Sequence, residues 1–129
     1  MDIPPQLSYT SEHEWCVMDG TEVIIGITRF AADQLGDIVF VELPAVATKL
    51  QANQSFGTVE SVKSVSDLYM PVTGTVTAVN AALNDAPQLV NEDPYRGGWM
   101  IRIQPDDPHS IGQLMSAEQY RDHIGSANH

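Results

Sequence analysis

Residues 57–74 read Gly-Thr-Val-Glu-Ser-Val-Lys-Ser-Val-Ser-Asp-Leu-Tyr-Met-Pro-Val-Thr-Gly, with Lys63 at the middle. The chain has only two lysines, and this one stands among small and β-branched residues with no second cation nearby. Valines that recur among serines favour strands, so the pattern predicts a β-hairpin whose tip lifts Lys63 into solvent. Pro71 and Gly74 then break the second arm and turn the chain into a new strand. A lysine in that position is accessible to an enzyme that acylates its amine.

Two further strands are predicted ahead of this hairpin, over residues 14–19 and 22–27, because an Asp-Gly dipeptide between them favours a tight turn. Thr28 is placed to cap a short helix over residues 29–35. Gly36 follows as the predicted C-terminal stop of that helix.

Two more segments have strand character. Residues 37–43 are apolar on both faces, which predicts a strand near the middle of the fold. Residues 99–104 predict the last strong strand, because three large apolar side chains alternate there with Met100 and Arg102. Trp99, Ile101 and Ile103 are therefore expected to face the core.

The C-terminal segment differs in kind from the rest of the chain. Residues 116–119 have the form of a capping box, and Tyr120 and Ile124 lie four residues apart, on one face of a helix. Gly125 is a predicted helix end. The pattern predicts a short amphipathic helix over residues 116–125 that packs on the sheets.

Length and composition indicate one globular domain spanning residues 1–129. The chain is 43% hydrophobic and 18% charged, which is ordinary for a globular protein, and no window reaches the roughly 20 apolar residues of a membrane span. Many short strands with a few small helices predict a mostly β fold of two packed antiparallel sheets.

The charge balance excludes one class of partner. A formal net charge of −11 argues against binding a phosphate backbone, which needs clustered Lys and Arg. The first residues resemble neither a secretory signal nor an Arg-rich transit peptide, so a cytoplasmic protein of bacterial type is expected. A mature organellar form stays open.

Cysteine and histidine offer little chemistry. Cys16 is the sole cysteine, so it forms no internal disulfide, and it is expected to pack as a small apolar residue beside Trp15. His13 has no second ligand at metal spacing, so a structural role is expected for it. No Gly-x-Ser-x-Gly motif surrounds the hairpin serines, and no other arrangement of residues predicts an enzyme.

Residues 59–69, followed by Pro71 and Gly74, resemble the lipoyl-attachment hairpin of glycine cleavage system H proteins, and Lys63 falls on the lipoyl-lysine of that family. The resemblance extends over most of residues 9–104. It continues in order through His13-Glu14-Trp15, Gly26-Ile27-Thr28, the stretch from Leu35 to Pro44, the stretch from Leu89 to Tyr95, and Gly98-Trp99.

The resemblance implies a lipoyl/biotinyl-type barrel-sandwich hybrid with a C-terminal helix, and lipoate attached covalently to Lys63. It implies a carrier that shuttles an aminomethyl group and catalyses nothing itself. Its partners would be a pyridoxal phosphate-dependent glycine decarboxylase, a folate-dependent aminomethyltransferase, dihydrolipoamide dehydrogenase and a lipoate-attaching enzyme. A monomer is expected for a carrier that visits several active sites.

Three acidic residues are further candidates for function. A carrier protects its loaded arm by placing the amine in a cleft near a carboxylate. Glu14, beside His13, and Asp67, four residues past Lys63, are the predicted contacts of that amine. Glu60 is a predicted recognition residue for the ligase or another partner. The alternative for Glu14 and Asp67 is a solvated surface acid or a turn residue.

The sequence departs from the family pattern at three positions. Arg29 stands where an acidic residue is usual, which puts in doubt whether partner docking at the first helix follows the family norm. Met70 replaces the customary small residue before Pro71, and Ala47 replaces a frequent glycine. None of these positions lies in the attachment motif.

Two alternatives remain open within the same chemistry. One is an H-like protein that mainly relays lipoate to other lipoyl domains, which the sequence does not separate from a glycine cleavage carrier. The other is a biotinyl or 2-oxoacid dehydrogenase lipoyl domain. Biotin hairpins usually place Met on both sides of the lysine, whereas Val62 and Ser64 stand there in this chain.

Overall fold

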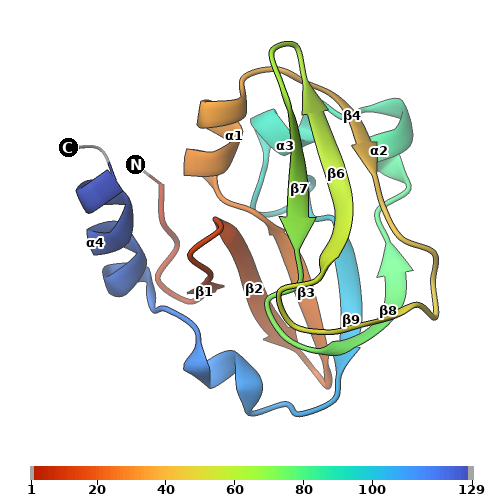
Figure 1. Cartoon of the computed structure of the whole chain (residues 1–129), viewed down its shortest axis with the longest axis vertical. Coiled ribbons are helices and arrows are strands. Elements are labelled where there is room, and N and C mark those ends of the chain that lie inside the picture. The colour runs from red at the N-terminus through yellow and green to blue at the C-terminus, as the bar shows by residue number, and fades with distance from the viewer. Residues whose placement is uncertain (1, 128–129) are drawn as a thin grey trace.

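The computed structural model describes residues 2–127 and consists of two packed antiparallel sheets with short helices around them (Figure 1). The larger sheet has the strand order β1-β2-β3-β9-β8-β5, and the smaller has the order β4-β6-β7. The larger sheet contains β1 (Ser8–Tyr9), β2 (Glu14–Asp19), β3 (Glu22–Ile27), β9 (Ile101–Pro105), β8 (Gly74–Val79) and β5 (Lys49–Leu50). The smaller contains β4 (Ile38–Glu42), β6 (Ser55–Ser61) and β7 (Val65–Tyr69).

The helices are short and peripheral. They are α1 (Arg29–Leu35), α2 (Ala82–Asp85), α3 (Leu89–Glu92), the 3-10 turn η1 (Ser110–Gln113) and α4 (Ala117–Ala127). No helix among residues 2–127 is long and apolar enough to cross a membrane. The mostly β architecture with two sheets and a C-terminal helix confirms the predicted fold class.

The first hairpin lies where the sequence predicted it. Strands β2 and β3 pair antiparallel, with Asp19 opposite Glu22 at the turn and Gly20 in the left-handed conformation at φ 67°. Cys16 and Ile25 are fully buried partners in this ladder. Burial raises the pKa of the Cys16 thiol to about 12, which keeps it protonated and unreactive at neutral pH.

The expectation that residues 37–43 form a central strand is wrong. Strand β4 lies at the edge of the smaller sheet, where it pairs with β6 only. The register shifts between Ile38 and Phe40, and Val39 and Phe40 are 48% and 50% exposed. One face of this segment is buried, whereas the apolar side chains Val39 and Phe40 are exposed, so the strand is not covered on both sides.

The last strand begins later than predicted. Strand β9 starts at Ile101, and Trp99 precedes it in a turn in which its N–H donates to the carbonyl of Arg96. Ile101 and Ile103 are fully buried as expected, whereas Trp99 is only partly buried. Met100 is fully buried as well, because its N–H donates to Ile25 O and brings it against the core.

The C-terminal helix has the predicted start and a later end. Ser116 Oγ accepts from the N–H of Gln119, and Gln119 Oε1 accepts from the N–H of Ser116, so the capping box is confirmed. Tyr120 and Ile124 are buried as predicted. The prediction that the helix ends at Gly125 is wrong, because α4 continues through this residue to Ala127.

Ala47 shows the physical consequence of one departure from the family pattern. Its φ is 76°, in the left-handed region that glycine enters most readily, and its N–H donates to the carbonyl of Val76 on β8. The frequent glycine of the family suits this conformation. Met70, a second departure, is 1% exposed and fills the core beneath the hairpin base.

Candidate functional site

Strands β6 and β7 form a hairpin (Figure 1), and Lys63 lies in the turn between them, as predicted. The tip is organised by the hydroxyl of Ser61, which accepts from the N–H groups of Lys63 (3.2 Å) and Ser64 (3.1 Å). Ser61 is 5% exposed, whereas Lys63 is exposed. The N–H of Val62 donates to Asp37 O at 3.0 Å, so the tip is held against the segment before β4.

The side chain of Lys63 lies beside the end of α1. A Cβ atom added to Gly36, the C-cap of α1, would lie 3.5 Å from Lys63 Cε. Gly36 has φ 81°, which glycine adopts without strain. Lys63 takes part in no salt bridge among residues 2–127. Its amine therefore stays free in solvent and close to α1.

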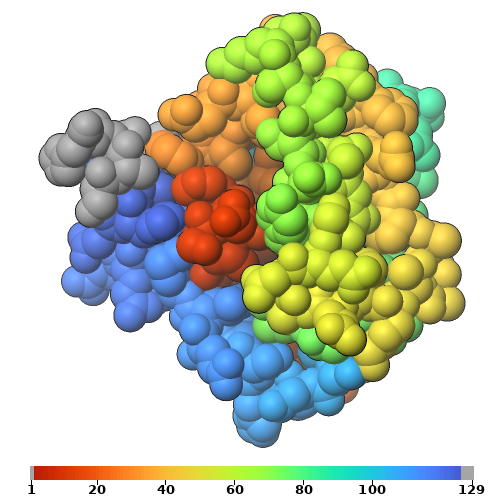
Figure 2. All heavy atoms as spheres, in the orientation of Figure 1, coloured from red at the N-terminus to blue at the C-terminus, as the bar shows by residue number. Residues whose placement is uncertain are grey.

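A cavity of about 310 Å³ lies between α1 and the hairpin. Figure 2 shows a hollow at this place, between the green hairpin and the red segment near the N-terminus. Its walls are largely apolar and come from α1, β3, β6 and β7, while a few polar side chains line the rest. The apolar lining residues are Ile27, Phe30, Ala31, Leu35, Val59 and Leu68, and the polar ones are His13, Gln34, Ser66 and Asp67.

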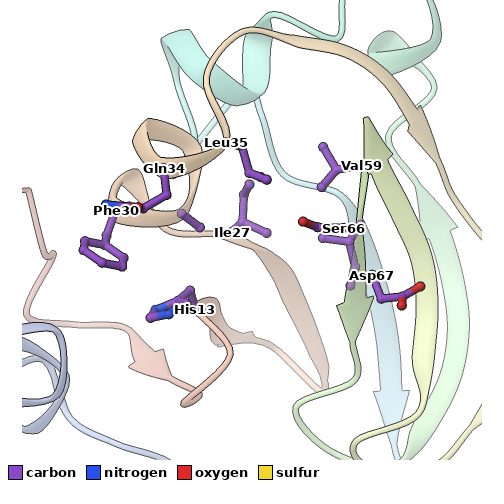
Figure 3. Close-up of a pocket in the computed structure, with 10 residues that line it drawn as sticks. His13, Ile27, Phe30, Gln34, Leu35, Val59, Ser66 and Asp67 are labelled. Atoms are coloured by element: carbon purple, nitrogen blue, oxygen red, sulfur yellow. The ribbon is translucent and has the colours of Figure 1, made fainter. Parts of the chain in front are cut away.

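The polar side chains on β7 point in different directions (Figure 3). Ser66 is directed toward the cavity, whereas the Asp67 carboxylate is directed away from it. This follows from the alternation of a strand, in which neighbouring side chains point to opposite faces. Asp67 is exposed and lies opposite Thr58 on β6.

Glu14 is buried at the base of the hairpin. It is 2% exposed, its Oε1 accepts from Thr10 Oγ1 at 2.6 Å, and its Oε2 accepts from the N–H of Tyr69 at 3.4 Å. Burial raises the pKa of Glu14 to about 7, against the lowering effect of these hydrogen bonds. The carboxyl group is therefore poised between its neutral and charged forms near neutral pH.

We expect Glu14→Gln to change how stability depends on pH. The pKa is about 7 in the folded chain against about 4.5 unfolded, so the folded state binds more protons between these values and the wild type loses stability as pH rises through that window. The difference between the folded and unfolded pKa values corresponds to about 3 kcal/mol in the free energy of unfolding, since one pKa unit is worth about 1.4 kcal/mol. Glutamine has no such titration.

Chemical denaturation at several pH values measures this effect. Relative to the wild type, Glu14→Gln gains stability from pH 4.5 to pH 7, while Glu92→Gln, at an exposed carboxylate, serves as the control. A constant difference between Glu14→Gln and the wild type across that range would contradict the assignment.

The structure does not bring the three predicted acids together. Glu14 is buried outside the cavity wall, Asp67 lies on the wall with its carboxylate turned outward, and Glu60 is exposed opposite Phe40 and Val65. Sequence reasoning missed Ser61 as the organiser of the tip and Ser66 as a cavity hydroxyl. The alternation of residues 65–69 is a signal that would have placed Ser66 and Asp67 on opposite faces.

His13 is part of the cavity wall and is not an isolated surface residue. Its Nδ1 lies 2.9 Å from the hydroxyl of Tyr120, and its ring packs against Phe30 at a centroid distance of 4.9 Å. Burial lowers its pKa, with a further contribution from His123. Within residues 2–127, no group of three or more His, Cys, Asp and Glu side chains is arranged to hold a metal ion.

Within residues 2–127, two antiparallel sheets present a lysine that forms no salt bridge at a hairpin tip, beside a largely apolar cavity, and this arrangement suits a carrier protein with a covalently attached arm. Residues 7–127 match the profile of the family described as "Glycine cleavage H-protein". The chain belongs to the glycine cleavage H-protein family. Members of this family are lipoyl carriers of the glycine cleavage system, they carry a lipoyl-lysine, and they are not enzymes.

Relatives support this assignment over nearly the whole chain. The glycine cleavage system H protein of Magnetococcus marinus is 58% identical over 120 residues, which cover 93% of this chain and 86% of the relative. The H protein of Bacillus cytotoxicus is 55% identical over 93% of this chain and 94% of the relative. The crystal structure of the Mycobacterium marinum H protein superimposes with a TM-score of 0.87 at 41% identity, covering 95% of this chain and 99% of that one.

Proposed function

We propose that Lys63 is the lipoyl-lysine and that residues 1–129 act as one carrier domain in the bacterial cytoplasm. The observation that carries this proposal is the position of Lys63, exposed at a hairpin tip whose backbone N–H groups donate to the hydroxyl of Ser61. Amide formation with lipoate removes the charge of the amine and leaves a long arm that ends in a dithiolane. That group supplies the redox and transfer chemistry that no side chain of this protein supplies.

The cavity beside α1 suits the arm in size and chemistry. Its apolar walls match an aliphatic chain, its volume is about 310 Å³, and Lys63 Cε lies close to Gly36 at the end of the same helix. Burial of an apolar chain there is favourable by about 25 cal/mol per Å² removed from water. The arm is therefore expected to rest along α1 between visits to other proteins.

The partners of the proposed carrier follow from the reaction that the family serves. They are the pyridoxal phosphate-dependent glycine decarboxylase, the folate-dependent aminomethyltransferase and dihydrolipoamide dehydrogenase, with a lipoate-attaching enzyme acting first. Glu60 is the proposed recognition residue for that ligase, because it is exposed two residues before the turn that carries Lys63. The carrier is proposed to be a monomer.

Glu14 and Asp67 are the proposed contacts of the amine on the loaded arm. Asp67 is among the residues that line the cavity, although its carboxylate is directed away from it, and Glu14 accepts a hydrogen bond from the N–H of Tyr69, two residues further along β7. Asp67→Asn is expected to shorten the lifetime of the loaded arm, because a charged hydrogen bond to the amine is lost. Asp85→Asn, at an exposed acid on α2, is the control. Equal lifetimes in the two variants would refute the contact.

The direct test is the intact mass of the protein after incubation with lipoate, ATP and a lipoate ligase. A single lipoyl addition that fragmentation places on Lys63 supports the proposal. An unmodified mass, with a second H protein modified in the same reaction, would overturn it.

A further inference from the structure

One buried hydroxyl connects the C-terminal helix both to the lining of the proposed arm cavity and to the N-cap of α1. Tyr120, on α4, is fully buried. Its hydroxyl lies 2.9 Å from Nδ1 of His13 and 2.8 Å from Oγ1 of Thr28. These partners are 107 and 92 residues away in the sequence, so the contact is a tertiary one.

One partner of Tyr120 lines the cavity, and the other caps a helix that lines it. His13 lines the cavity directly, and its φ of 73° is a left-handed conformation that neighbouring contacts must hold in place. Thr28 caps α1, because its Oγ1 accepts from the N–H of Ala31 at 3.2 Å. Helix α1 in turn supplies Phe30, Ala31, Gln34 and Leu35 to the lining. Tyr120 thus contacts one wall and the cap of the other.

The buried hydroxyl of Thr28 needs an acceptor, and this favours one direction of proton donation through the two contacts of Tyr120. Among the hydrogen bonds of residues 2–127, the Tyr120 oxygen is the only acceptor available to the buried hydroxyl of Thr28. In that arrangement, the Tyr120 hydroxyl is left to donate to Nδ1 of His13. Burial keeps His13 neutral by lowering its pKa, and it keeps the Tyr120 phenol protonated by raising its pKa. A neutral ring that accepts at Nδ1 carries its proton on Nε2.

We propose that Tyr120 is a positioning residue for the arm cavity: its hydroxyl sets the tautomer of His13 and holds that residue against α1, and this governs how long the loaded arm stays in place. The inference rests on the proposed function, in which the arm occupies this cavity. It assigns a role to α4 that neither the attachment hairpin nor the cavity lining requires.

Tyr9 provides a matched control for Tyr120. The two rings stack at a centroid distance of 4.7 Å and an interplanar angle of 8°, and both residues are fully buried. The Tyr9 hydroxyl donates to Pro4 O and contacts neither cavity wall. Tyr120→Phe and Tyr9→Phe each keep the stacked rings and remove one hydroxyl, so only the first breaks the link to His13.

The experiment combines a spectroscopic and a kinetic measurement on the full chain. Ring-nitrogen NMR on the unlipoylated protein reports the His13 tautomer. The lipoylated protein is then loaded with an aminomethyl group by a glycine decarboxylase and glycine. One water molecule hydrolyses the bond between sulfur and the aminomethyl group, which returns the thiol and releases formaldehyde and ammonia. The rate at which these two products appear measures the loss of the loaded group. Tyr120→Phe is expected to lose the single Nε2–H tautomer and to release about fivefold faster, the size of effect of one lost hydrogen bond. Tyr9→Phe matches the wild type in both.

A second variant guards against a folding defect in Tyr120→Phe. His13→Asn keeps a residue that tolerates the left-handed backbone and removes the ring, so it is expected to release as fast as Tyr120→Phe. An unchanged tautomer in Tyr120→Phe, or an unchanged release rate in both variants, would overturn the inference. Absence of lipoyl addition to Lys63 in the wild type would instead overturn the proposed function, and the tautomer measurement does not depend on it.

Discussion

Lys63→Arg is expected to abolish lipoyl addition completely. Arginine keeps the positive charge and much of the length of the side chain, but its guanidinium stays protonated and is not acylated under these conditions. The tip geometry is unaffected, because Ser61 bonds to the backbone N–H of residue 63 rather than to its side chain. Intact mass after incubation with lipoate, ATP and a ligase checks the result. Glycine-dependent carbon dioxide release with a decarboxylase is expected to fall to background in the same variant.

Lys49→Arg is the matched control, because it replaces the other lysine of the chain. Lys49 forms a surface ion pair with Asp106 at 2.5 Å, and arginine maintains that pair. This variant is expected to accept one lipoyl group as the wild type does. Addition to Lys63→Arg at another position would show that the hairpin is not what the ligase reads.

Local sequence patterns predicted the elements whose signals lie within a few residues. The β2–β3 hairpin, the cap of α1 at Thr28 and the capping box of α4 all depend on neighbouring side chains, and all were confirmed. The position of β4 depends on which strand pairs with it, which is a long-range property. Its two apolar faces suggested a central place, whereas β6 occupies that place and β4 lies at the edge.

The site divides in the same way. The accessible lysine followed from a short motif, and the structure places it at the predicted tip. The cavity wall, by contrast, combines His13 with α1 and β7, so no local pattern could reveal it. The link from Tyr120 to His13 spans nearly the whole chain, and the sequence signal for Tyr120 was only its place on the buried face of a helix.

Gly57→Ala is expected to destabilise the fold by about 4 kcal/mol or more, at the upper end of single substitutions. A Cβ atom at residue 57 would lie 2.1 Å from the backbone oxygen of Glu42 in β4. Strands β4 and β6 cannot separate to make room without breaking their hydrogen-bonded pairing at Glu42 and Thr58. Gly57 also opposes Leu68, so the strain falls at the base of the hairpin that carries Lys63. Chemical denaturation measures the loss, and lipoylation of the variant is expected to fall with the folded fraction.

Gly112→Ala separates this steric effect from the general effect of replacing glycine. A Cβ atom at Gly112, in η1, has no heavy atom within 4 Å, so its substitution is expected to change stability by no more than about 0.5 kcal/mol. If the free energies of unfolding of Gly57→Ala and Gly112→Ala differed by less than about 1 kcal/mol, the close approach of β4 and β6 would be incorrect. The packing of β4 against the base of the hairpin that carries Lys63 would then have to be reconsidered.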